Sequence, residues 1–132
     1  IVATVSEGGE EYRIATTHFT WSPAGNTTDA QREDFARLKA ILLQYKDLVL
    51  CGDFNAPRGR EMFSSFESLY KDNVPKEVTT TIDKDLHYAG DKNLQLVVDS
   101  IFTTPHYQVS EVKMLSGVSD HLGIFGVLSK SK

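Results

Sequence analysis

The chain has 132 residues, of which 40% are hydrophobic and 24% are charged, as in an ordinary globular domain with one hydrophobic core. Its 18 acidic and 14 basic residues give a net charge of -4. A protein that holds duplex DNA mainly through its phosphates is usually basic, so this charge argues against a large non-specific DNA-binding surface.

Compartment signals are few. The sequence contains no apolar run of the roughly 20 residues that a membrane span needs, and no basic-then-apolar signal peptide at its start. The single cysteine, Cys51, cannot form an internal disulfide. It fits a reducing compartment and favours a cytoplasmic location. Because Cys51 lies in an apolar stretch, we interpret it as a core residue rather than a nucleophile.

The first half of the chain predicts two strands, a helix and a third strand. The polar turn Glu7-Gly8-Gly9-Glu10 joins the first two strands into a hairpin. Apolar residues then recur at steps of three and four along the helix, which Thr28 or Asp29 can cap. The third strand is continuously apolar, as in strands covered on both faces. The predicted ranges are 1–5 and 12–19 for the hairpin, 29–45 for the helix and 48–51 for the strand.

The second half predicts another helix and three more strands. The expected ranges are 61–70 for the helix and 94–102, 109–115 and 123–128 for the strands, with 73–90 mostly loop. This order predicts an α+β fold in which a mixed, mostly antiparallel sheet has helices on one face. The other face of the sheet would be bare, so we expect a missing segment or a partner to cover it.

Polar residues lie at the ends of several predicted strands. Asp53 and Asn55 come directly after the apolar run 48–51, and Asp120-His121 precedes the last strand. In extended backbone, residues two apart point to the same side, so we expect Asp53 and Asn55 to share one rim with His18, at the end of the second strand. Two carboxylates, an amide and an imidazole can bind a divalent cation and activate water for attack on phosphorus. A β-turn and a polar loop are the simpler interpretations of these same residues.

Asp99 interrupts a strongly apolar strand, where an unpaired carboxylate is costly. His121 is its expected partner, because a carboxylate fixes the tautomer of an imidazole and supports its positive charge. Asp120, next to His121, would then point to the metal.

Three other polar residues, Asp83, Asp85 and His87, alternate like ligands on a strand. They lie in a predicted loop, so we favour a solvated segment over a second metal site. Arg58 and Arg60 either hold a substrate phosphate or belong to an exposed helix start. Trp21 either stacks on a substrate or caps the core.

Four ordered motifs resemble those of one family, the endonuclease/exonuclease/phosphatase superfamily with its deoxyribonuclease I-like fold. The resemblance runs from Ile1 to about Leu128. It implies a four-layer α/β/β/α sandwich and hydrolysis of phosphodiesters or phosphomonoesters with Mg²⁺ or Mn²⁺. The motifs are Thr17-His18-Phe19, Gly52-Asp53-Phe54-Asn55-Ala56-Pro57, Val98-Asp99-Ser100-Ile101-Phe102 and Ser119-Asp120-His121.

The resemblance also implies a role for each site residue. Asp53 would orient or deprotonate the attacking water and bind the metal together with Asp120. Asn55 would steady the phosphoryl oxygens, and His18 would contact the phosphate or assist the leaving group. His121, oriented by its partner Asp99, would bind the scissile phosphate.

The resemblance covers only the C-terminal half of the family's domain, because members are about twice this length. Their first half supplies one sheet and a glutamate that is a principal metal ligand; Glu7, Glu10 and Glu11 lie in a hairpin turn and are poor substitutes. We expect residues 1–132 to be a fragment, one chain of a split protein or a dimerising half, with little turnover in isolation.

Two functions are therefore compatible with the sequence. The first is a metal-dependent phosphoesterase in which this chain carries the C-terminal half of the active site. Its substrate is a phosphate ester, either a nucleic acid or a small phosphorylated molecule. The second is a non-catalytic half-domain that binds a partner chain through its bare sheet.

Overall fold

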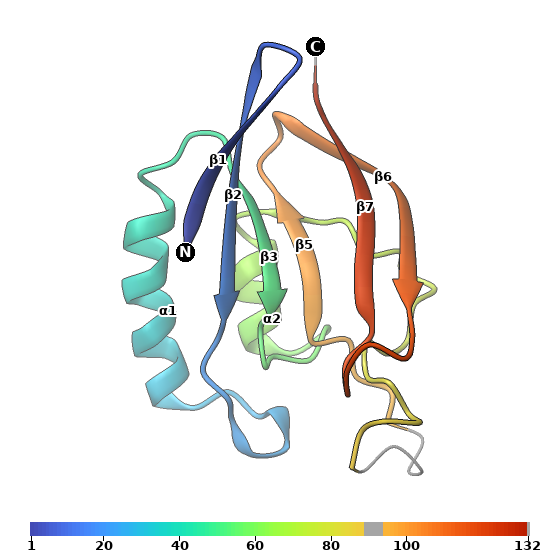
Figure 1. Cartoon of the computed structure of the whole chain (residues 1–132). Coiled ribbons are helices and arrows are strands. Elements are labelled where there is room, and N and C mark those ends of the chain that lie inside the picture. The colour runs from blue at the N-terminus through green and yellow to red at the C-terminus, as the bar shows by residue number, and fades with distance from the viewer. Residues whose placement is uncertain (89–93, 132) are drawn as a thin grey trace.

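The computed structural model describes residues 1–88 and 94–131. Its largest sheet has five strands in the order β1-β2-β3-β5-β4 (Figure 1). Strands β2 and β3 are parallel, and the other neighbours in this sheet are antiparallel. The strands are β1 (Val2–Glu7), β2 (Glu10–His18), β3 (Val49–Asp53), β4 (Lys71–Asp72) and β5 (Asp99–Thr103).

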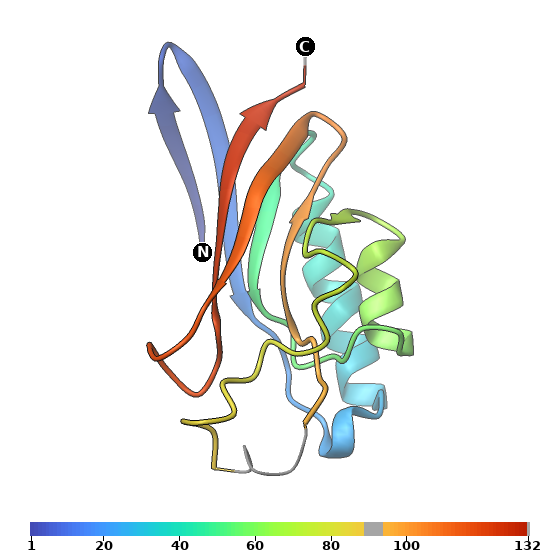
Figure 2. The same ribbon diagram turned by 90° about the vertical axis from the view of Figure 1, so that its right-hand side faces the viewer.

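Two helices, α1 (Asp29–Leu42) and α2 (Glu61–Glu67), lie on the same side of this sheet (Figure 2). Thr28 caps α1, because its hydroxyl oxygen accepts a hydrogen bond from the backbone N–H of Gln31 at 3.2 Å. Within 1–88 and 94–131, no helix has the length and apolar composition that a membrane crossing requires.

The main core fills the space between the helices and the sheet. Phe66 of α2 is fully buried at its centre, and its ring contacts four other rings at centroid distances of 4.8–5.9 Å. Those rings come from α1, β5 and the segments after β2 and β3, so one aromatic cluster ties the helices to the strand ends. The four residues are Phe19, Phe35, Phe54 and Phe102.

A second sheet lies against the opposite face. It consists of β6 (Tyr107–Leu115) and β7 (Gly123–Lys130), paired antiparallel, and Figure 2 shows this hairpin across the sheet from the helices. An open cavity of about 340 Å³ separates the two sheets. Its apolar lining includes Ile14, Val49, Cys51, Ile101, Val109, Ile124 and Leu128.

The observed α+β architecture confirms the predicted fold class, with three corrections. The predicted bare face is partly covered, because the last two strands form their own sheet instead of extending the first. The helices end at Leu42 and Glu67, earlier than predicted. Residues 94–98 form no strand, because their backbone is bonded to loops: Leu96 O accepts from Thr81 N at 2.9 Å, and Val98 O from Phe54 N at 2.8 Å. Residues 73–88 are irregular apart from a bridge at Ile82, as predicted, and 89–90 lie outside the described residues.

Candidate active site

The site begins where β2 and β3 end side by side. His18 and Asp53 are register partners in the parallel pair, and Gly52 precedes Asp53 at φ +140°. A Cβ atom at Gly52 would lie 1.9 Å from the carbonyl oxygen of Thr17. Only glycine therefore allows the two strand ends to approach this closely.

Asp53 is the central carboxylate. Its side chain is 20% exposed, its Oδ1 accepts the backbone N–H of Asn55 at 2.7 Å, and its Oδ2 lies 3.6 Å from Nε2 of His18. Burial is the main cause that raises the pKa of Asp53, and the negative charge of Asp99 raises it further. The Asn55 N–H and the two histidines oppose this rise. The carboxylate is therefore held in a place where a nearby positive charge would stabilise it.

Asn55 lies at the same rim as Asp53, but its backbone conformation differs from the extended one that the sequence predicts. Its φ is +48°, so it lies in a turn and not in extended backbone. Asparagine tolerates this left-handed conformation better than most residues. Its amide nitrogen donates to the carbonyl oxygen of Phe19 at 2.8 Å, which joins the β3 loop to the end of β2.

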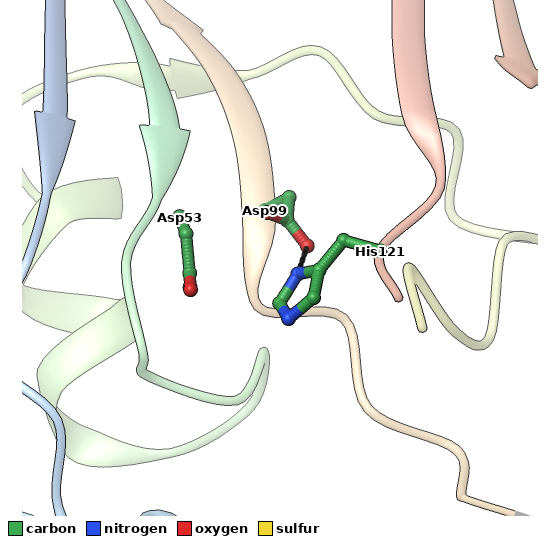
Figure 3. Close-up of side chains that lie close together, drawn as sticks. All are labelled: Asp53, Asp99 and His121. Carbon is green, nitrogen blue, oxygen red and sulfur yellow. Dashed lines mark hydrogen bonds and ion pairs between the residues drawn. The ribbon is translucent and has the colours of Figure 1, made fainter. Parts of the chain in front are cut away.

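Asp99 and His121 form the pair that the sequence predicts. Nδ1 of His121 donates to Oδ2 of Asp99 at 2.8 Å (Figure 3). This hydrogen bond is the main cause that raises the pKa of His121, so the charged imidazolium is favoured. The fully buried hydroxyl of Thr81 accepts the backbone N–H groups of Val98 and Asp99 at 3.1 and 3.2 Å, which holds the start of β5 in place.

Three of these side chains can share one cation. Ligand atoms of Asp53, Asp99 and His121 all lie within 4.8 Å of one another, and Figure 3 shows the three side chains around one space. Carboxylate oxygens suit Mg²⁺ and Mn²⁺. His121 is a ligand only in its neutral form and through Nε2, because its Nδ1 is bonded to Asp99. The donor set and the raised pKa of Asp53 therefore fit a divalent cation.

Asp120 lies beside this group rather than in it. Its side chain is exposed, and among the described residues the cluster of ligand atoms does not include it. Its negative charge contributes to the raised pKa of His121, and its carbonyl oxygen accepts the N–H of Asp83 at 3.0 Å. Its role as a metal ligand stays a prediction.

Asp83 has a structural position that the sequence does not reveal. It is 3% exposed, so the interpretation of this residue as part of a solvated segment is wrong. Its carboxylate accepts the backbone N–H groups of Gly117 at 2.7 Å and Asp85 at 3.0 Å, which lower its pKa. Asp83 thereby ties its loop to the β6–β7 turn. His87 instead faces the site, with its ring centroid 6.4 Å from that of His121.

Arg58 and Arg60 differ in their burial and in their contacts. Arg58 is 14% exposed and forms an ion pair with Asp72 at 2.7 Å. It also donates to the carbonyl oxygens of Val74, Pro75 and Val78, so it stabilises a loop and is not placed to hold a phosphate. Arg60 is exposed and donates to the carbonyl oxygen of Ala24.

A cleft of about 430 Å³ adjoins the site, and both Asn55 and His121 line it. Trp21 is another wall residue and is 67% exposed, so it does not cap the core. Tyr88, Ser22 and Thr81 are contributors to the site region that sequence reasoning missed. No sequence pattern marks them, because only the fold brings Ser22 and Tyr88 to the cleft and bonds Thr81 to the backbone of Asp99.

Comparison with solved structures shows the same fold. The human Nocturnin catalytic domain with bound sulfate anion is 21% identical over 98% of this chain, with a TM-score of 0.66. An endonuclease/exonuclease/phosphatase from Bacteroides vulgatus is 18% identical over 94%, with a TM-score of 0.64. Sphingomyelinase C from Streptomyces griseocarneus is 12% identical over 99%, with a TM-score of 0.55.

This chain spans about half the length of these structures, namely 51%, 51% and 56%. Comparison with curated protein sequences gives no significant match. A family model, however, matches residues 2–121 and so covers nearly the whole chain, including both strand-end motifs and the Asp99–His121 pair. The chain belongs to the endonuclease/exonuclease/phosphatase family.

Proposed function

We propose that this chain carries the C-terminal half of the active site of a divalent-cation-dependent phosphoesterase. The observation that carries the proposal is the convergence of Asp53, Asp99 and His121, whose ligand atoms lie within 4.8 Å of one another. Family membership supports the same chemistry. The reaction is hydrolysis of a phosphate ester by attack of water on phosphorus.

Asp53 is the group that orients the attacking water and accepts its proton. Its carboxylate is fixed by the Asn55 N–H and has a raised pKa, so it is a better proton acceptor than a solvated aspartate. An amide nitrogen has two hydrogens, and donation to Phe19 leaves the second hydrogen of Asn55 for a phosphoryl oxygen. His18 is 80% exposed beside Asp53, where it can contact the phosphate or assist the leaving group.

His121 stabilises the negative charge that develops on the phosphoryl oxygens. The hydrogen bond to Asp99 favours its imidazolium form and fixes the direction of the ring. Asp53 and Asp120 are the proposed ligands of Mg²⁺ or Mn²⁺. A cation held there would supply positive charge to the phosphate and to the attacking water.

The rest of the site comes from a second polypeptide segment, either a preceding half of the same protein or another chain. Two observations support this part of the proposal. The chain spans about half of its structural relatives, and a glutamate ligand is not among the three gathered side chains in the described residues. The substrate is a nucleic acid or a small phosphorylated molecule.

A non-catalytic binding half is the second candidate. The observation that favours it is the open apolar cavity between the two sheets, which a partner could fill. This candidate function does not explain the half-buried Asp53 carboxylate or the oriented His121, so we rank it below the phosphoesterase.

Hydrolysis by the assembled enzyme tests the proposal. We expect Asp53→Ala or His121→Ala to lower the Mg²⁺-dependent hydrolysis of bis(p-nitrophenyl) phosphate by about 100-fold or more, since each variant removes a group that acts in the transition state. His106→Ala is the matched control, because His106 also pairs with an aspartate, Asp47 at 2.7 Å, before β3 and away from the site. Retained hydrolysis in the Asp53 or His121 variant would exclude the proposal.

A further inference from the structure

Gln31 is a buried side chain in the first turn of α1. It is 1% exposed, although glutamine is mostly a surface residue, and it lies three residues after the N-cap residue Thr28. In a capping box of this spacing, the glutamine side chain turns back and accepts the N–H of the N-cap residue. The Oε1 of Gln31 instead has no hydrogen-bond partner among the residues that the structure describes. Capping of α1 therefore does not explain why this side chain is buried.

The amide nitrogen of Gln31 reaches the two loops that carry site residues. It lies 2.7 Å from the carbonyl oxygen of Thr20, in the loop after β2, and 3.5 Å from that of Asn55, in the loop after β3. An amide nitrogen has two hydrogens, so it can serve both oxygens at once. Figure 1 shows that α1 begins at the end of the sheet where β2 and β3 stop. Gln31 thereby connects the two loops to each other and to the helix.

The helix holds Thr20 at a second point. The Thr20 hydroxyl donates to Oδ2 of Asp34 at 2.6 Å, and Asp34 lies three residues after Gln31, on the same side of α1. The carbonyl oxygen of the residue before Thr20, Phe19, accepts the side-chain amide of Asn55 at 2.8 Å. The segment that receives the Asn55 amide is therefore itself fixed to α1.

Asn55 depends on this support, because its backbone is in the left-handed region at φ +48°. Such a conformation costs free energy in a residue other than glycine and persists where neighbouring groups hold it. Gln31 contacts the Asn55 carbonyl oxygen, and the Phe19 carbonyl group sets the direction of the Asn55 amide. Movement of either loop would turn this amide.

We propose that Gln31 is a positioning residue for Asn55, which fixes the direction of the Asn55 amide by holding the loops after β2 and β3 together. The inference rests on the proposed function, in which this amide donates to a phosphoryl oxygen. Gln31 is buried, so it acts through Asn55 and not on the substrate. Its effect is therefore on the stabilisation of the transition state rather than on substrate binding.

Gln31→Met tests this role, because it keeps the length of the side chain and removes both amide hydrogens. We expect kcat for the Mg²⁺-dependent hydrolysis of bis(p-nitrophenyl) phosphate by the assembled enzyme to fall about tenfold, with KM changed by less than about twofold. Should this variant fail to fold, Gln31→Asn makes the same test, since it keeps the amide but shortens its reach. Gln44→Met is the matched control, because Gln44 is exposed and donates only locally, to the Ala40 carbonyl oxygen at 3.4 Å. It should leave kcat unchanged.

A double-mutant cycle separates positioning from a general loss of structure. Asn55→Gly suits the positive φ and removes the side-chain amide, so Gln31→Met should lower kcat no further in this background. A second tenfold loss there, or an unchanged kcat in the single variant, would overturn the proposal.

The Asn55 amide also reports on this link without any hydrolysis. In the ¹⁵N-labelled full chain, the Asn55 side-chain proton that is bonded to Phe19 should move upfield in Gln31→Met and stay in place in Gln44→Met. An Asn55 amide signal that Gln31→Met leaves unchanged would overturn the positioning role, even where hydrolysis that depends on Asp53 upholds the proposed function. A shifted signal in a protein without such hydrolysis would uphold the link between Gln31 and Asn55 and show that the proposed function had failed.

Discussion

At the scale of single residues, Gly52 controls how closely Asp53 approaches its neighbours. The glycine has no Cβ, so β3 can pass within contact of the Thr17 carbonyl group and place Asp53 next to His18. A side chain here would separate the strand ends and displace the central carboxylate of the site.

Gly52→Ala should therefore lower the free energy of unfolding by at least about 2 kcal/mol, because it combines a forbidden contact with an unfavourable φ. Urea unfolding followed by circular dichroism measures this change. Gly9→Ala is the control, since Gly9 also has a positive φ, +83°, but open space around its Cβ position. The control should cost about 1 kcal/mol. Equal losses in both variants would show that the Thr17 contact is unimportant.

Residue chemistry could be predicted from the sequence where one local argument sufficed. A carboxylate inside an apolar strand needs a partner, and this reasoning leads from Asp99 to His121. Arg58 and Asp83 could not be assigned in this way. Their partners, Asp72 and the backbone of Gly117, are far away along the chain, and only the fold brings them together.

At the scale of elements, the loop between β3 and α2 carries Asn55 and must be held in place. Arg58 of this loop forms a buried ion pair with Asp72 of β4, and Asp72 also accepts the hydroxyl of Ser100 in β5 at 2.6 Å. One aspartate thus connects the loop after Asp53 to the strand that begins with Asp99.

Asp72→Ala should destabilise the chain by about 3–5 kcal/mol, because it leaves the charge of Arg58 buried without its partner. Glu33→Ala is the comparison. It breaks an exposed pair with Arg37, at 73% and 71% side-chain exposure, and should cost less than about 1 kcal/mol. Chemical denaturation of the two variants measures both losses in the free energy of unfolding. A loss at Asp72 no larger than that at Glu33 would contradict a structural role for this pair.

Most elements were predictable because hydrophobic periodicity and turn residues act locally. The hairpin, both helices and the strand that leads into Asp53 all lie close to their predicted ranges. The pairing of the strands was harder to predict from the sequence. Nothing local distinguishes a β6 that joins the first sheet from one that turns away after Thr104 and forms a second sheet with β7. The sequence of 94–98 predicts a strand because it is apolar, but in the structure these apolar residues line the cleft and the core as part of a loop.

At the scale of the whole molecule, the site lies at one end of two facing sheets (Figures 1 and 2). The five-stranded sheet contributes His18, Asp53 and Asp99, and His121 precedes a strand of the second sheet. The site therefore requires the two sheets to keep their relative positions. The apolar cavity between them lies beside Asp53 and Asp99, so a segment that fills it would also support these two carboxylates.

Metal-dependent stability of the chain tests the central claim most directly. Asp53 and Asp99 repel each other, so a divalent cation should relieve this repulsion and stabilise the fold by mass action. We predict that millimolar Mg²⁺ or Mn²⁺ raises the Tm of the chain by several degrees, and that Asp53→Asn abolishes this rise. Because burial disfavours its charged form, Asp53→Asn should not lower the Tm in EDTA.

Asp85→Asn is the control, because it removes a carboxylate of equal size from an exposed loop position. It should keep the full metal response. A Tm that does not change with metal, or a rise that persists in Asp53→Asn, would contradict the proposal that Asp53 is a ligand in the cation site of a phosphoesterase.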